Sequence, residues 1–258
     1  MRTLGLVAIA LFPQPLVSQA SADARAATAL LHRQGFKVER LAASRPPFYA
    51  FIARGHDDSL PSVVVARTGR DPALMGKPLA LGQFLPSNVR WVQLPDSVLL
   101  LQLAYDNLVE GMVGTTLYRI YDDSVVKFFT DGRDACAPAS LKDLNSDGVP
   151  ELVVHSEDPS HGDCGEQCEM TITESFHVTP GWVQVRQWHA HNFISAEPEF
   201  PEFYRDLARR YDAVDRWLKS DAADATQCRD VYWLENGDLF AALAQRARDV
   251  AAKKGGLR

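Results

Sequence analysis

Apolar and polar residues alternate over short stretches through most of the chain, and turn residues separate these stretches. Runs of this kind, rich in Val, Ile, Leu and aromatic side chains and bounded by Pro, Gly, Asp or Ser, are typical of β-strands. They predict strands at residues 36–41, 48–53, 62–67, 89–94 and 98–105. We therefore expect the first part of the molecule to form a meandering sheet.

Two further pairs of runs predict antiparallel hairpins. Residues 115–121 and 124–129 flank an Asp-Asp turn, and residues 170–178 and 182–188 flank a Thr-Pro-Gly turn. In the run 170–178 the apolar residues alternate with polar ones, as a sheet with one buried face requires. The middle of the chain is therefore expected to be a mainly antiparallel, blade-like meander.

The apolar residues change their period in the last quarter of the chain. From Phe203 to Leu218 they recur at helical spacing with charged residues between them. A second helix is predicted to begin near Asp238 and to end at residues 253–255. A short helix near the start of the chain should end at Gly35. The predicted fold class is α+β, a mostly antiparallel sheet followed by C-terminal helices, and not a complete propeller.

The first residues differ in composition from the rest of the chain. Arg2 precedes the apolar run LGLVAIALF, and small residues between Ser18 and Ala24 offer cleavage sites, which is the pattern of a secretory signal peptide. The apolar run breaks at Pro13 and is shorter than the roughly 20 residues that a membrane-spanning helix needs. We expect a periplasmic or secreted protein with no membrane span after signal removal. The expected division is a signal peptide at 1–22, a β domain at 23–195 and a helical region at 196–258.

The cysteines and the net charge indicate which kinds of site and partner the protein is expected to have. An even number of cysteines in a chain with an export signal favours disulfides over free thiols. The candidates are Cys136, Cys164, Cys168 and Cys228, whose pairing the sequence leaves open. Their spacing does not match a regular zinc site. The formal net charge of −6 argues against a general nucleic-acid binder.

The stretch DLNSDGVPELVV carries the clearest chemical motif. Asp143, Asn145, Asp147 and Glu151 stand at its first, third, fifth and ninth positions, and a glycine at the sixth allows a sharp turn. Alternating oxygen donors on a tightly curled backbone suit a hard cation such as Ca²⁺, and the carbonyl of Val149 would lie at the seventh position. The twelfth position is a valine, so the loop is not an EF-hand.

The pattern Asp-x-Asn-x-Asp-Gly-x-x-Glu before an apolar strand resembles the FG-GAP/VCBS family, the calcium loops of integrin-type β-propeller blades. The resemblance covers about a quarter of the chain in a single copy, too few for the ~4–8 blades of a propeller. It implies Ca²⁺ ligation within residues 143–151 by these five residues: Asp143, Asn145, Asp147, Val149 and Glu151.

The alternative for this stretch is a turn in which the Asp and Asn side chains bond to their own backbone. Between Asp143 and Glu169 there are eight acidic residues and no Lys or Arg, so the local potential attracts cations. Because the bidentate twelfth ligand is missing, we expect the weak affinity of an extracellular module, with a Kd on the order of 10⁻⁴–10⁻³ M. An ion bound that weakly would be structural.

Other candidate chemistry is less specific. His189 and His191 at a strand end, with His155 and His161 in the acidic segment, suggest a transition-metal site or unrelated surface histidines. Trp91, Trp182 and Trp188 are candidates for a glycan or peptide surface or for the core. No nucleophile elbow, zincin helix or phosphate-binding loop is present, and no catalytic residue is assigned.

Together these features predict an exported Ca²⁺-binding structural or interaction module with one FG-GAP-like loop, whose protein or glycan partner is unknown. The alternative is an exported metal-assisted hydrolase that uses the acidic and histidine-bearing segment to activate water. The motif content favours a protein that is not an enzyme.

Overall fold

The computed structural model describes residues 16–56, 60–80, 85–107, 112–131, 139–155, 172, 175–178, 181–220 and 238–253. The chain divides into two compact units, residues 1–80 and 81–258. The boundaries that we expected at residues 22 and 195 stay predictions.

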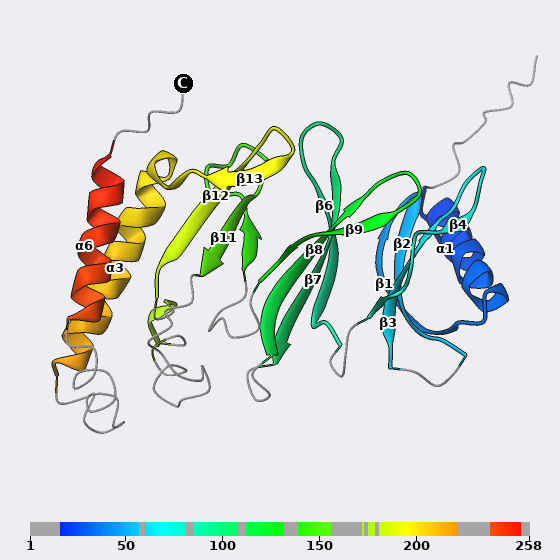
Figure 1. Cartoon of the computed structure of the whole chain (residues 1–258), viewed down its shortest axis with the longest axis horizontal. Coiled ribbons are helices and arrows are strands. Elements are labelled where there is room, and N and C mark those ends of the chain that lie inside the picture. The colour runs from blue at the N-terminus through cyan, green and yellow to red at the C-terminus, as the bar shows by residue number, and fades with distance from the viewer. Residues whose placement is uncertain are drawn as a thin grey trace, which may run out of the picture. The chain divides into compact units, whose positions relative to one another are not determined.

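In its described residues, the first unit contains one helix and one antiparallel sheet (Figure 1). Its elements are α1 (Leu16–Arg33), β1 (Lys37–Arg45), β2 (Phe48–Arg54), β3 (Ser62–Arg67), β4 (Ala73–Leu74) and β5 (Leu79–Ala80). The strands pair in the order β1-β2-β3-β4, and β5 also pairs with β3. This first sheet confirms the strands predicted at 36–41, 48–53 and 62–67.

Helix α1 packs against the first sheet through its C-terminal half. Ala27 and Leu31 are fully buried in one cluster with Tyr49, Phe51 and other residues of β2 and β3. As predicted, Gly35 lies just after the end of the helix, and it has a φ of +84°. The N–H of Phe36 donates to the Leu31 carbonyl (3.0 Å), the hydrogen bond that closes a Schellman motif. Residues after the expected signal cleavage sites therefore belong to the core of this unit.

The second unit begins with two four-stranded antiparallel sheets. The second sheet consists of β6 (Asn88–Gln93), β7 (Leu99–Asn107), β8 (Met112–Ile120) and β9 (Val125–Thr130). The third sheet consists of β10 (Ser140–Lys142), β11 (Glu151–His155), β12 (Val183–His189) and β13 (Asn192–Ser195). In each sheet the strands pair in chain order, so both sheets are simple meanders.

The chain ends, within its described part, in helices. A 3₁₀ turn, η2 (Glu197–Glu199), leads into α3 (Pro201–Leu218), and α6 (Leu239–Ala252) follows. The apolar stripe predicted for each helix is buried, since Leu207 and Val214 of α3 and Phe240 and Ala247 of α6 are at most 6% exposed.

The third sheet lies between the second sheet and the helix pair (Figure 1). Side chains alternate between the two faces of a strand, so β11 supplies both layers. Leu152 and Val154 pack toward Leu100 and Leu117 of the second sheet. Val153 packs with the helices on the opposite face. The continuous apolar run Leu152–Val154 thus suits a strand that is buried on both sides.

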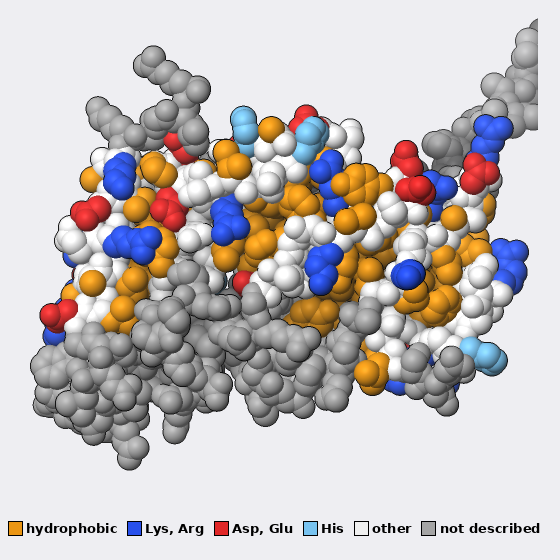
Figure 2. Space-filling model, in the orientation of Figure 1, with side chains coloured by type: hydrophobic (Ala, Val, Ile, Leu, Met, Phe, Trp, Pro, Cys, Tyr) orange, Lys and Arg blue, Asp and Glu red, His pale blue; other side chains and the backbone are white. Residues whose placement is uncertain are grey.

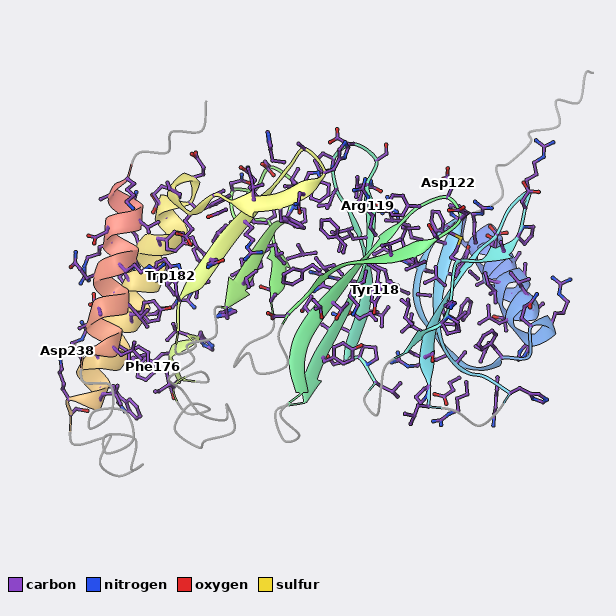
Figure 3. All side chains as sticks on the ribbon, viewed as in Figure 1. Tyr118, Arg119, Asp122, Phe176, Trp182 and Asp238 are labelled. Carbon is purple, nitrogen blue, oxygen red and sulfur yellow. The ribbon has the colours of Figure 1, made fainter. Side chains whose placement is uncertain are left out.

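Two tyrosines of α3 form hydrogen bonds with the backbone of β12 and of the residue Gly181 that precedes it. The Tyr204 hydroxyl accepts a hydrogen bond from the Val185 N–H (3.2 Å) and donates one to the Val183 carbonyl (3.0 Å). The Tyr211 hydroxyl donates to the Gly181 carbonyl (2.6 Å). The ring of Trp182 stacks on Tyr204, with ring centroids 5.5 Å apart. Trp182 is labelled in Figure 3. The helical region therefore shares one core with the third sheet.

The predicted fold class is confirmed: the described residues form antiparallel sheets followed by C-terminal helices, without a closed or propeller sheet. The hairpin predicted from 170–178 and 182–188 is wrong. Strand β12 pairs with β11 and β13, and Ile172 and Phe176 have helical backbone. Both side chains pack into the core with the helices. A short apolar run can serve a strand or a buried turn, and here core packing decided the outcome.

Within the described residues, no helix combines the length and the hydrophobicity that crossing a membrane requires.

Candidate metal site

The predicted calcium loop connects β10 to β11. Lys142, the last residue of β10, pairs with Glu151, the first residue of β11. The loop is therefore held at both ends by one antiparallel ladder. The strand predicted after the loop is present as β11, so the change from oxygen-rich loop to apolar strand occurs where the sequence places it.

Side chains of the loop bind its own backbone. The Asp143 carboxylate accepts hydrogen bonds from the N–H groups of Asp147 (3.1 Å) and Gly148 (2.9 Å). The Asn145 side-chain oxygen also accepts from Asp147 N–H (3.1 Å), and the Asp147 carboxylate accepts from Val149 N–H (2.7 Å). These contacts curl the chain around the first aspartate, and they are the bonds that an Asx-type turn makes.

The turn requires left-handed backbone at two positions. Ser146 has a φ of +61° and Gly148 a φ of +85°. A Cβ at Gly148 would have no atom within 4 Å, so the glycine serves backbone conformation and not a close approach. This is the role predicted for the sixth position of the motif.

Glu151 differs from the other oxygen donors of the loop. Asp143, Asn145 and Asp147 are exposed, whereas Glu151 is 0% exposed. Its Oε2 accepts a hydrogen bond from Leu144 N–H (2.8 Å), but its Oε1 has no hydrogen-bond partner among the described residues. Burial raises the pKa of Glu151, and the nearby charges of Asp147 and Asp143 raise it further, against the opposing effect of backbone N–H donors.

The loop thus combines three exposed oxygen-bearing side chains with one buried carboxylate, of which one oxygen is hydrogen-bonded and the other has no partner among the described residues. A buried carboxylate is costly unless it is paired, hydrogen-bonded or bound to a metal. Within the described part of the chain, no three His, Cys, Asp or Glu side chains gather closely enough to hold a metal ion. Ligation by Asp143, Asn145, Asp147, Val149 and Glu151 therefore stays a prediction.

The histidines do not form one site in the described structure. His155, at the end of β11, pairs with Val183 at the start of β12, whereas His189 is the last residue of β12. The whole strand therefore separates them. His191 lies in a left-handed two-residue turn (φ +72°), so it does not share a strand face with His189 as the H-x-H spacing suggested. His161 lies outside the described residues.

His189 and His191 are exposed, and histidine side chains lie along the upper edge of the surface in Figure 2. His191 Nδ1 lies 4.0 Å from Asp96 Oδ2 of the β6–β7 turn. His155 is partly buried, and burial lowers its pKa to about 4, with the charge of Lys142 contributing in the same direction. His155 is therefore neutral at physiological pH.

The remaining candidates are two core tryptophans, the partly buried Trp91 of β6, and residues that the structure does not describe. Trp182 and Trp188 are 4% and 7% exposed, so they belong to the core and not to a binding surface. Trp188 packs edge-on against Phe193, with ring centroids 5.2 Å apart. The four cysteines named as disulfide candidates lie outside the described residues.

Comparisons of the chain with protein-family models, with curated proteins and with solved structures found no match. The likeness to FG-GAP loops therefore rests on residues 143–151 themselves.

Proposed function

We propose that this chain is an exported protein that binds Ca²⁺ through the loop 143–151 and acts as a structural or interaction module. The observation that carries the proposal is the unpartnered, buried Oε1 of Glu151 at the ninth position of the motif. A divalent cation would supply the positive charge that this carboxylate lacks.

The positions of the other donors support the proposal. Asp143 and Asp147 are exposed on the same loop, and their charges act on Glu151. Two like-charged aspartates beside a buried glutamate repel one another, and a bound cation would reverse that repulsion. Because Glu151 begins β11, an ion held by the loop would also fix the start of a strand that contacts both neighbouring layers. The expected role of the ion is therefore to stabilise the third sheet.

Thermal unfolding in chelator, Ca²⁺, Mg²⁺ and Zn²⁺ tests this proposal. With a Kd of about 1 mM, Ca²⁺ at about 10 mM should add about 1.4 kcal/mol of stability. Asp143→Ala should abolish the gain, and Asp123→Ala is the matched control because it removes an exposed aspartate from the β8–β9 turn.

For each variant, the unfolding midpoint in Ca²⁺ is compared with the midpoint in chelator. Asp143 accepts two backbone hydrogen bonds, so its loss destabilises the loop in both conditions, and this cost cancels in the difference. An equal Ca²⁺ response in wild type and Asp143→Ala, or no response in wild type, would contradict the proposal.

The second candidate function is the exported metal-assisted hydrolase. The observation in its favour is a cavity of about 280 Å³ that is lined by His155 and His177 and also by Leu144 of the loop. A neutral imidazole beside a cavity can bind a transition metal or accept a proton. A rise in midpoint that is larger with Zn²⁺ than with Ca²⁺, and lost in His155→Gln, would favour this function over the calcium module.

A further inference from the structure

The cavity lies on the helix-facing side of the third sheet, where β10 and β11 meet α3 and residues 175–178. One part of its wall is apolar. That part is formed by Leu144, Val153, Val178, Val183, Phe203 and Leu207. A volume of about 280 Å³ is just below the range of about 300–1,000 Å³ that is usual for drug-sized ligands. The cavity therefore suits a smaller molecule with an apolar body.

The polar part of the wall carries one charge that is not compensated within the described residues. Arg210 is paired with Asp206 (2.6 Å) and donates to the His177 carbonyl (2.9 Å). Among the described residues Lys142 forms no ion pair, although it lines the same cavity. The imidazole of His155 is neutral at physiological pH, as its lowered pKa requires. Lys142 and Arg210 are the cations of the lining and Asp206 is its only carboxylate, so the described lining has an excess of one positive charge.

We propose that this cavity binds a small monocarboxylate with an apolar chain, its carboxylate on Lys142 and its chain against Val153, Val183 and Leu207. The ammonium of lysine is carried on a flexible four-carbon stem, so it can follow a carboxylate at the cavity mouth. The apolar chain replaces water against the valine and leucine side chains, which favours binding in proportion to the area buried. Neither contact involves the calcium loop's oxygen donors.

Calorimetric titration of the full chain with hexanoate tests the proposal, with 1-hexanol as the uncharged analogue and butanoate as the shorter one. The buffer is freed of metal with a chelating resin, because soluble chelators are themselves carboxylates. Each methylene should contribute about fourfold in affinity, so hexanoate should bind about fifteenfold more tightly than butanoate. Hexanol should bind at least about tenfold more weakly than hexanoate, because it lacks the charge-assisted hydrogen bond.

Lys142→Gln is the decisive variant. Lys142 is exposed at the end of an edge strand, so its replacement should leave the fold intact. Lys127→Gln is the matched control, since Lys127 is an exposed lysine on the edge strand β9. We expect at least about a tenfold loss of hexanoate affinity in Lys142→Gln and none in Lys127→Gln. No binding of hexanoate, equal binding of hexanol, or an equal loss in both variants would overturn the proposal.

Discussion

His155 is predicted to make the second unit less stable as the pH falls below neutrality. In the unfolded chain this histidine takes up a proton as the pH falls through its ordinary pKa of 6.5. In the folded protein, burial and the charge of Lys142 keep it neutral down to about pH 4. The unfolded state therefore binds more protons between these values, and stability is lost as the pH falls through this window.

The size of the effect follows from the two pKa values. A shift from 6.5 to about 4 gives a loss of about 2 kcal/mol between about pH 7 and about pH 5. His155→Gln keeps a polar side chain at the end of β11 but removes the titration. The free energy of unfolding of the variant should therefore fall by about 2 kcal/mol less than that of the wild type over the same pH change. Carboxylates titrate in both proteins, so their contribution cancels in the comparison.

Urea unfolding followed by tryptophan fluorescence is the suitable assay. All five tryptophans lie beyond residue 80, so the fluorescence reports on the second unit alone. His191→Gln serves as the control, because His191 is exposed in the β12–β13 turn. If the wild type and His155→Gln lose stability in parallel from pH 7 to pH 5, burial does not hold His155 neutral in the folded protein.

Two further predictions concern buried polar groups of the second unit. Tyr204→Phe should cost about 2 kcal/mol in urea unfolding, because the buried Val183 carbonyl and Val185 N–H lose their bonds to the hydroxyl, and the exposed Tyr121→Phe should change little. A Tyr204→Phe protein as stable as the wild type would show that these bonds are not formed. Glu151→Gln should stabilise the protein in chelator at neutral pH. Burial raises the pKa of Glu151, so the folded protein favours the protonated side chain, and this stabilisation is lost as the pH rises through the raised pKa. Glutamine is uncharged at every pH and avoids that loss. The gain should disappear below the ordinary pKa of 4.5 in a pH series of unfolding midpoints, and a gain that is independent of pH would exclude this cause.

Local patterns in the sequence predicted much of the secondary structure. The helical spacing from Phe203 to Leu218 became α3, and the glycine at position 35 ended α1 in the left-handed conformation that the pattern required. The oxygen-rich loop with its glycine at position 148 curls as predicted and leads into β11. These features depend on neighbours within a few residues, so the order of the side chains along the chain suffices to predict them.

Only the tertiary structure decided which strands pair and which polar groups are buried. Residues 170–178 alternate like a strand, but β12 pairs with β11 and β13, and Ile172 fills the core beside α3. The cavity joins residues of β10, β11, α3 and the segment at 175–178, and no local pattern connects them.

Glu151 and Asp143 look alike in the sequence, yet one carboxylate is fully buried with an unpartnered oxygen and the other is exposed. The identity of a residue sets the chemistry that it can perform. Its burial, its pKa and its partners come from long-range packing, and that packing distinguishes a candidate ligand from an ordinary turn residue.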